Sequence, residues 1–121
     1  MDDNMGRLLK ALDDLGLADN TVVVFTSDNG YYNGEHGLGD KRPAYDQSLR
    51  IPMLVRYPRL VGPGTLCDDM VLNIDIAPTF LELAAVPVPT TMQGKSWQPL
   101  LAGKKVAWRQ SFLAEYFYER G

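Results

Sequence analysis

Residues 21–30 have the sequence TVVVFTSDNG, whose pattern indicates the architecture of this chain. The first six residues of this stretch are β-branched or aromatic and apolar on both faces, which predicts a buried strand over residues 21–26. Such a strand is typical of a mainly parallel sheet that is flanked by helices. Residues 2–15 place leucines at helical spacing, and Gly16 follows at the expected C-terminal cap. An amphipathic helix followed by a buried strand predicts an α/β fold.

The remaining elements are short. Further strands are expected over residues 51–57 and 111–118, and a short helix over residues 43–49. Asp75 is placed to cap another helix, and the proline-rich residues 87–99 are expected to form mostly a loop. So few strands make a thin sheet with exposed edges, which predicts part of a larger domain and a tendency to self-associate when the chain is isolated.

Composition excludes several classes of protein. The chain has 121 residues, of which 45% are hydrophobic and 22% charged, which is the balance of a globular domain rather than a disordered segment. Twelve Lys and Arg against fifteen Asp and Glu give a net charge of −3, so nucleic-acid binding has no electrostatic support. No apolar run is long enough for a transmembrane helix. The single cysteine, Cys67, cannot form an internal disulfide.

The irregular, glycine-rich stretch over residues 27–42 is the first place to expect chemistry, because it leaves the carboxyl end of a buried strand. Asp28 and Asn29 open it. A carboxylate beside an amide oxygen is a pair of hard ligands suited to Ca²⁺ or Mg²⁺. The alternative is a turn in which Asp-Asn-Gly simply reverses the chain at a strand end.

Two further side chains of this stretch carry candidate roles. Lys41 could direct a positive charge at an anion held by the metal, or it could be an ordinary solvated lysine. His36, the only histidine, could donate a proton or a hydrogen bond to a leaving group, or it could be a surface histidine hydrated by water. Residue chemistry alone leaves both pairs of alternatives open.

The ordered motifs of the chain resemble the type I sulfatase family of the alkaline phosphatase-like superfamily. The resemblance rests on TSDNG at 26–30, GEHG at 34–37, Lys41, Tyr45 with Asp46, and LRIP at 49–52. It continues weakly through DIAPT at 75–79 and GKS at 94–96, so it covers nearly the whole chain. The fold that it implies is part of a sulfatase domain, incomplete in this chain.

The resemblance also implies roles for these residues. Asp28 and Asn29 would be metal ligands that complete the shell of an active-site Ca²⁺, with Mg²⁺ or another divalent cation as an alternative. Lys41 would contact the sulfate oxygens as a catalytic and substrate-binding residue, and His36 would lie near the substrate in a similar role. A divalent cation and a lysine both stabilise the negative charge that builds up as a sulfate ester is cleaved.

One part of the family pattern is absent from these 121 residues. Sulfatases attack with a formylglycine made from the Cys or Ser of the motif C/S-x-P-x-R, and Cys67 is followed by Asp69 and Val71 where Pro and Arg are required. The chain over residues 1–121 is therefore interpreted as a partial catalytic domain. It would lack the N-terminal part that carries the nucleophile and the C-terminal subdomain, and alone it is expected to be inactive.

These observations favour a sulfuric ester hydrolase acting on a sulfated sugar or an aryl sulfate. One alternative is a phosphate or phosphonate ester hydrolase of the same superfamily. Another is a non-catalytic, truncated remnant. The family resemblance further implies an exported protein, whether periplasmic, secreted or lysosomal.

Overall fold

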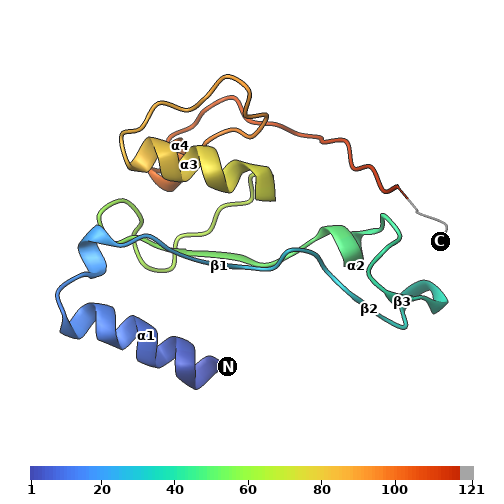
Figure 1. The fold of residues 1–121 in the computed structure, drawn as a ribbon, viewed down its shortest axis with the longest axis horizontal. Helices are drawn as coiled ribbons and strands as arrows, with labels where there is room; N and C mark the ends of the chain where they lie inside the picture. Colours follow the sequence, from blue (N-terminus) through green and yellow to red (C-terminus); the bar gives the residue numbers. More distant parts are fainter. Residues whose placement is uncertain (118–121) are drawn as a thin grey trace. The chain divides into compact units, whose positions relative to one another are not determined.

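The computed structural model describes residues 1–117, and these form two compact units (Figure 1). The first unit contains Met1–Val23 and Arg56–Gln110, and the second contains Val24–Val55 with the residues that follow Gln110. No helix in the described residues has the length and hydropathy that a membrane span requires.

The first unit is mainly helical. Its elements are α1 (Asp2–Asp14), the 3₁₀ turns η1 (Ala18–Asn20) and η3 (Asn73–Asp75), α3 (Ile76–Leu83) and α4 (Gln98–Leu101). The helix expected over residues 2–15 is confirmed as α1, which ends where Gly16 adopts a φ of 66°. That left-handed conformation lets the N–H of Leu17 donate to the carbonyl of Leu12 at 2.8 Å, closing the helix end.

Asp75 is the centre of the first unit. Its side chain is fully buried, and its carboxylate accepts the N–H of Leu72 at 2.8 Å and the N–H of Lys95 at 2.7 Å. Arg109 donates to the same carboxylate through both terminal nitrogens. The expectation that Asp75 caps a helix is confirmed for its position, since Asp75 is the N-cap residue of α3. Its side chain makes no cap hydrogen bond to α3, because the carboxylate bonds to segments before and after the helix.

The segment that follows Gly94 packs closely on this centre. A Cβ at Gly94 would lie 1.9 Å from the carbonyl oxygen of Ile74, so only glycine fits there. Buried Thr79 accepts the N–H of buried Trp97 at 3.0 Å and donates to the carbonyl of Asp75 at 2.6 Å. Asp75 thus joins η3, the start of α3, residues 94–97 and Arg109 into one hydrogen-bonded core.

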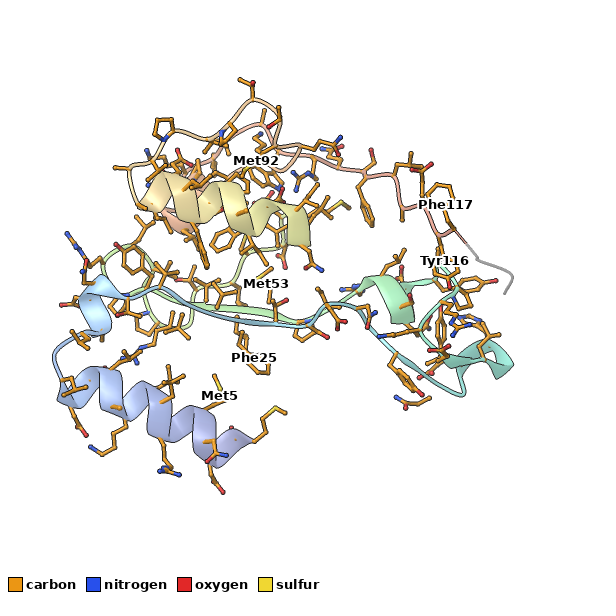
Figure 2. All side chains as sticks on the ribbon, in the orientation of Figure 1. Met5, Phe25, Met53, Met92, Tyr116 and Phe117 are labelled. Carbon is orange, nitrogen blue, oxygen red and sulfur yellow. The ribbon has the colours of Figure 1, made fainter. Side chains whose placement is uncertain are left out.

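A two-stranded sheet is formed by β1 (Val23–Thr26) and β4 (Met53–Arg56). All of its residues except Val23 and Arg56 belong to the second unit. These strands confirm the two expected over residues 21–26 and 51–57, with later starts. The expectation that the first of them is buried is wrong, because a strand with a single neighbour is left half-buried, and Phe25 is exposed. The two strands run in opposite directions in Figure 1, so this pair is an antiparallel element of a fold expected to be mainly parallel. Phe25 of β1 and Met53 of β4 project to opposite faces of the pair (Figure 2), so each face carries an apolar side chain.

The stretch over residues 27–42 is more ordered than expected. It contains the short strands β2 (Tyr32–Asn33) and β3 (Gly39–Asp40), which pair antiparallel, and the 3₁₀ turn η2 (Glu35–Gly37) between them. The helix expected over residues 43–49 forms only as α2 (Asp46–Leu49). It starts late because Tyr45 is extended, with φ −103° and ψ 168°.

The strand expected over residues 111–118 is not formed within the described residues. Ser111 to Phe117 adopt no regular structure, and Tyr118 lies outside the part of the chain that the structure describes. Aromatic and β-branched composition favours a strand only where a neighbouring strand supplies hydrogen bonds and packing. None of the described strands pairs with this segment.

Asp75 supplies a prediction about stability. Burial raises the pKa of Asp75, but the hydrogen bonds from Arg109 and from two backbone N–H groups outweigh it and hold the pKa below the ordinary value of 3.8. A lowered folded-state pKa stabilises the protein above the unfolded-state pKa, and this stabilisation is lost as the pH falls through the folded-state pKa. Asp75→Asn should therefore lower the free energy of unfolding at pH 7 by about 3–5 kcal/mol, and by less at pH 3, which lies below the unfolded-state pKa.

Urea unfolding of the two proteins at both pH values measures this difference. Asp14→Asn is the matched control, because Asp14 pairs with Lys10 at 2.6 Å on the exposed face of α1 and its loss should cost less than about 0.5 kcal/mol. Equal losses in the two variants would contradict a central role for the Asp75 carboxylate.

Candidate functional site

The candidate site begins where β1 ends. Ser27 donates a hydrogen bond to the carbonyl of Asn29 at 2.7 Å, and the N–H of Asn29 donates to Oδ1 of Asp28 at 3.0 Å. These local contacts are those of a tight turn. They use Oδ1 of Asp28, while the side chain as a whole stays 81% exposed. The turn and a metal-ligating role are therefore compatible, because the turn presents the carboxylate to solvent.

Gly30 fixes this turn against α2. Its N–H donates to the carbonyl of Ser48 at 2.8 Å. A Cβ at this position would lie 1.9 Å from the carbonyl oxygen of Gln47, a backbone atom that cannot swing away. The glycine of the Asp-Asn-Gly sequence is thus required by a close approach to another segment.

Ser48 also holds the far end of the loop. Its buried hydroxyl donates to the carbonyl of Lys41 at 2.8 Å. One residue of α2 therefore binds both Gly30 and Lys41, 11 residues apart in the chain. Sequence reasoning missed Ser48, although it directly precedes the LRIP block and so had a motif beside it.

The structure brings Lys41 and Asp28 together. The Lys41 ammonium lies 4.0 Å from Oδ2 of Asp28, with both side chains on the surface. Hydrogen bonds from the N–H groups of Asn29 and of Asp28 itself, together with the charge of Lys41, lower the pKa of Asp28. The carboxylate is consequently ionised at neutral pH, which is the form that binds a cation.

His36 belongs to the same loop and is held by a different contact. It lies in η2 with a φ of 57°, and its imidazole stacks on the ring of Tyr45 with 4.7 Å between centroids and 21° between planes. The preceding Glu35 accepts the N–H of Asn33 at 2.6 Å, which closes the turn around the histidine. The loop thus presents a carboxylate, an amide, an ammonium and an imidazole from one contiguous segment.

These groups do not make a complete metal site by themselves. Within residues 1–117 no group of three or more His, Cys, Asp or Glu side chains is arranged to hold a metal ion. Asp28 and Asn29 supply two oxygen donors of the hard type, and Ca²⁺ takes about six to eight. The donor chemistry fits a calcium or magnesium ion whose other ligands come from elsewhere.

The chain is similar to several known proteins. Residues 34–120 match the family of N-sulphoglucosamine sulphohydrolase C-terminal regions. An N-acetylglucosamine-6-O-sulfatase of Bacteroides thetaiotaomicron is 43% identical over 120 residues, covering 97% of this chain and 22% of that protein. The chain thus spans about a fifth of the length of this relative.

Solved structures show the same relationship. A protein in complex with its substrate D-glucosamine-2-N,6-O-disulfate has a TM-score of 0.90 and 41% identity, covering 97% of this chain and 24% of that one. A phosphonate monoester hydrolase from Silicibacter pomeroyi has a TM-score of 0.84 and 30% identity, covering 90% of this chain and 22% of that one. These matches define the class as alkaline phosphatase-like hydrolases. The chain belongs to the sulfatase family and corresponds to the C-terminal part of its domain.

The contact between Lys41 and Asp28 gives a prediction. Removing the ammonium in Lys41→Met should raise the pKa of Asp28 toward the ordinary aspartate value, because the charge of Lys41 is one cause of its lowering. An NMR titration of the carboxyl carbons measures this. Arg42→Met is the control, since Arg42 pairs with Asp40 at 2.9 Å, and it should leave the Asp28 titration unchanged. An unchanged Asp28 titration in Lys41→Met would contradict the contact.

Proposed function

We propose that this chain supplies the metal- and sulfate-binding part of a sulfuric ester hydrolase. The observation that carries the proposal is the pairing of Asp28 with Lys41 at the end of β1, at 4.0 Å, on a loop whose two ends are tied to Ser48. This arrangement offers an anionic ligand for a cation and a cationic ligand for an anion side by side. Binding of a sulfate ester through a divalent metal needs an anionic ligand for the metal and a positive charge for the sulfate group.

Asp28 and Asn29 are proposed as two ligands of a Ca²⁺ ion, with Mg²⁺ as the alternative. Their support is the ionised, exposed carboxylate of Asp28 and the adjacent amide. A divalent cation, when bound, polarises the sulfate oxygens and stabilises the charge that develops during cleavage. The chain's own contribution is to hold these two donors in a fixed turn.

Lys41 and His36 are proposed to bind the sulfate group. The ammonium of Lys41 is a compact charge beside a metal ligand, so it can reach the oxygens of an anion held by that metal. The imidazole of His36 can donate a hydrogen bond or a proton to the leaving oxygen. Lys41 would serve in binding and in catalysis, and so would His36.

The nucleophile belongs to another part of the proposed enzyme. A formylglycine made from a C/S-x-P-x-R motif is expected there, because residues 1–121 contain no such motif. Under this proposal, residues 1–121 are one portion of a catalytic domain and are inactive alone.

A sulfated sugar is the favoured substrate class, since the relatives include an N-acetylglucosamine-6-O-sulfatase and a structure with a disulfated glucosamine. Export from the cytoplasm is part of the same proposal and follows from the family resemblance.

A phosphonate ester hydrolase is the second candidate. It is favoured by one observation, the TM-score of 0.84 with the phosphonate monoester hydrolase. Calcium chemistry argues for the sulfatase, because Asn29 is a hard oxygen ligand at a position where a softer metal would favour histidine. Turnover of a sulfated glucosamine and of a phosphonate monoester by the complete protein that carries this chain separates the two.

Lys41→Ala should lower kcat in that complete protein by about 100-fold or more, the scale of losing one contact to transition-state charge. Steady-state hydrolysis of a sulfated glucosamine measures it. Lys10→Ala is the matched control, because Lys10 pairs with Asp14 on the surface of α1, and it should retain normal turnover. Normal turnover in Lys41→Ala would overturn the proposed role of the lysine.

Asp28→Ala should abolish metal-dependent hydrolysis in the same protein. Treatment with a chelator should stop the wild-type enzyme, and added Ca²⁺ should restore it, whereas Asp28→Ala should not be restored. Isothermal titration with Ca²⁺ gives a readout besides activity, in which the variant should lose binding heat. Calcium binding of unchanged affinity in Asp28→Ala would exclude Asp28 as a ligand.

A further inference from the structure

The imidazole of His36 lies outside the turn at Asp28, on the 3₁₀ turn η2. It is exposed and lies on a turn flanked by glycines, where Gly34 has a φ of 114° and Gly37 a φ of 67°. Such a turn by itself does little to restrict the direction of a side chain. A ring that must direct one nitrogen at a substrate needs a contact that fixes its plane.

Tyr45 supplies that contact. Its ring lies 4.7 Å from the imidazole, centroid to centroid, with the planes 21° apart, and it is itself 52% exposed. Parallel stacking at this distance buries one face of each ring and favours a single orientation of the imidazole plane by up to about tenfold.

Tyr45 is held in turn by Tyr32. The side chain of Tyr32 is 1% exposed, and its hydroxyl donates to the carbonyl of Pro43 at 2.7 Å and accepts the N–H of Tyr45 at 3.2 Å. The two tyrosine rings meet edge to face, with 6.5 Å between centroids and 88° between planes. A buried residue thus fixes both the backbone and the ring of Tyr45.

We propose that Tyr45 is a positioning residue for His36, with Tyr32 as its buried support. Tyr45 orients the imidazole plane and acts on the reaction only through it. The expected effect of Tyr45 on turnover rests on the proposed role of His36 in binding sulfate. The orientation of the imidazole by Tyr45 is independent of that role.

The first test uses the fact that His36 is the only histidine of the chain, so its ring protons give one unambiguous pair of NMR signals. At one fixed pH, Tyr45→Leu should move both signals toward those of a histidine in an unfolded peptide, because the ring current of Tyr45 is lost. Tyr45→Phe keeps the ring and should keep the signals. Tyr31→Leu is the matched control, since Tyr31 is similarly exposed at 58% in the same loop, and it should leave them unchanged.

The second test is a double-mutant cycle in the complete protein that carries this chain. Tyr45→Leu should lower kcat/KM for a sulfated glucosamine by up to about tenfold, and Tyr45→Phe should restore it. In a His36→Ala background, Tyr45→Leu should cause no further loss, because a positioning residue has nothing left to orient. A purely structural role would lower activity equally in both backgrounds.

The two tests distinguish a failure of Tyr45 to orient the imidazole from a failure of His36 to act in the reaction. Unchanged His36 signals in Tyr45→Leu would overturn the positioning role, provided that the backbone amide signal of Gly30, which donates to the carbonyl of Ser48, shows that the second unit is folded. Additive losses in the cycle would overturn it as well. Full activity of His36→Ala would instead overturn the proposed role of His36 in the reaction, and the NMR comparison would still decide whether Tyr45 orients the ring.

Discussion

Ser48 is the residue on which the candidate site depends. Its carbonyl accepts the N–H of Gly30 and its hydroxyl donates to the carbonyl of Lys41, so one short helix holds both ends of the loop. The hydroxyl is buried, and a buried group left without its partner is costly. Because Gly30 follows Asp28 and Asn29 directly, the spacing between the proposed metal ligands and Lys41 is set by backbone atoms rather than by flexible side chains.

Different interactions hold the segments of the two units together. In the first unit a buried carboxylate, Asp75, collects two N–H groups and the guanidinium of Arg109, so the desolvation of its charge is offset by directed hydrogen bonds. In the second unit the charged groups are on the surface, and neutral backbone contacts provide the order. The buried charge of Asp75 is therefore structural, whereas Asp28 and Lys41 carry their charges at the surface.

Much of the fold and part of the site followed from local patterns. The strand over residues 21–26 and the helix over residues 2–15 were predictable because apolar periodicity and a glycine cap act locally. Asp28 and Lys41 stood out because they belong to ordered motifs. The stacking of His36 on Tyr45 was not predictable, since it depends on how a loop of irregular backbone folds over itself. The expected strand over residues 111–118 does not form in residues 111–117, because high strand propensity is not sufficient where no described strand pairs with the segment.

The contacts that build the site are also close together along the chain. Asp28 and Lys41 are separated by 13 positions, Tyr32 and Tyr45 by 13, and Gly30 and Ser48 by 18, whereas Asp75 and Arg109 are 34 positions apart. Closing a short loop costs less chain entropy than closing a long one, and folding is faster where contacts are local. The loop that presents Asp28, His36 and Lys41 is therefore better suited to forming early during folding than the contact between Asp75 and Arg109. During synthesis on the ribosome, it would be completed before the arginine that closes the other unit has emerged.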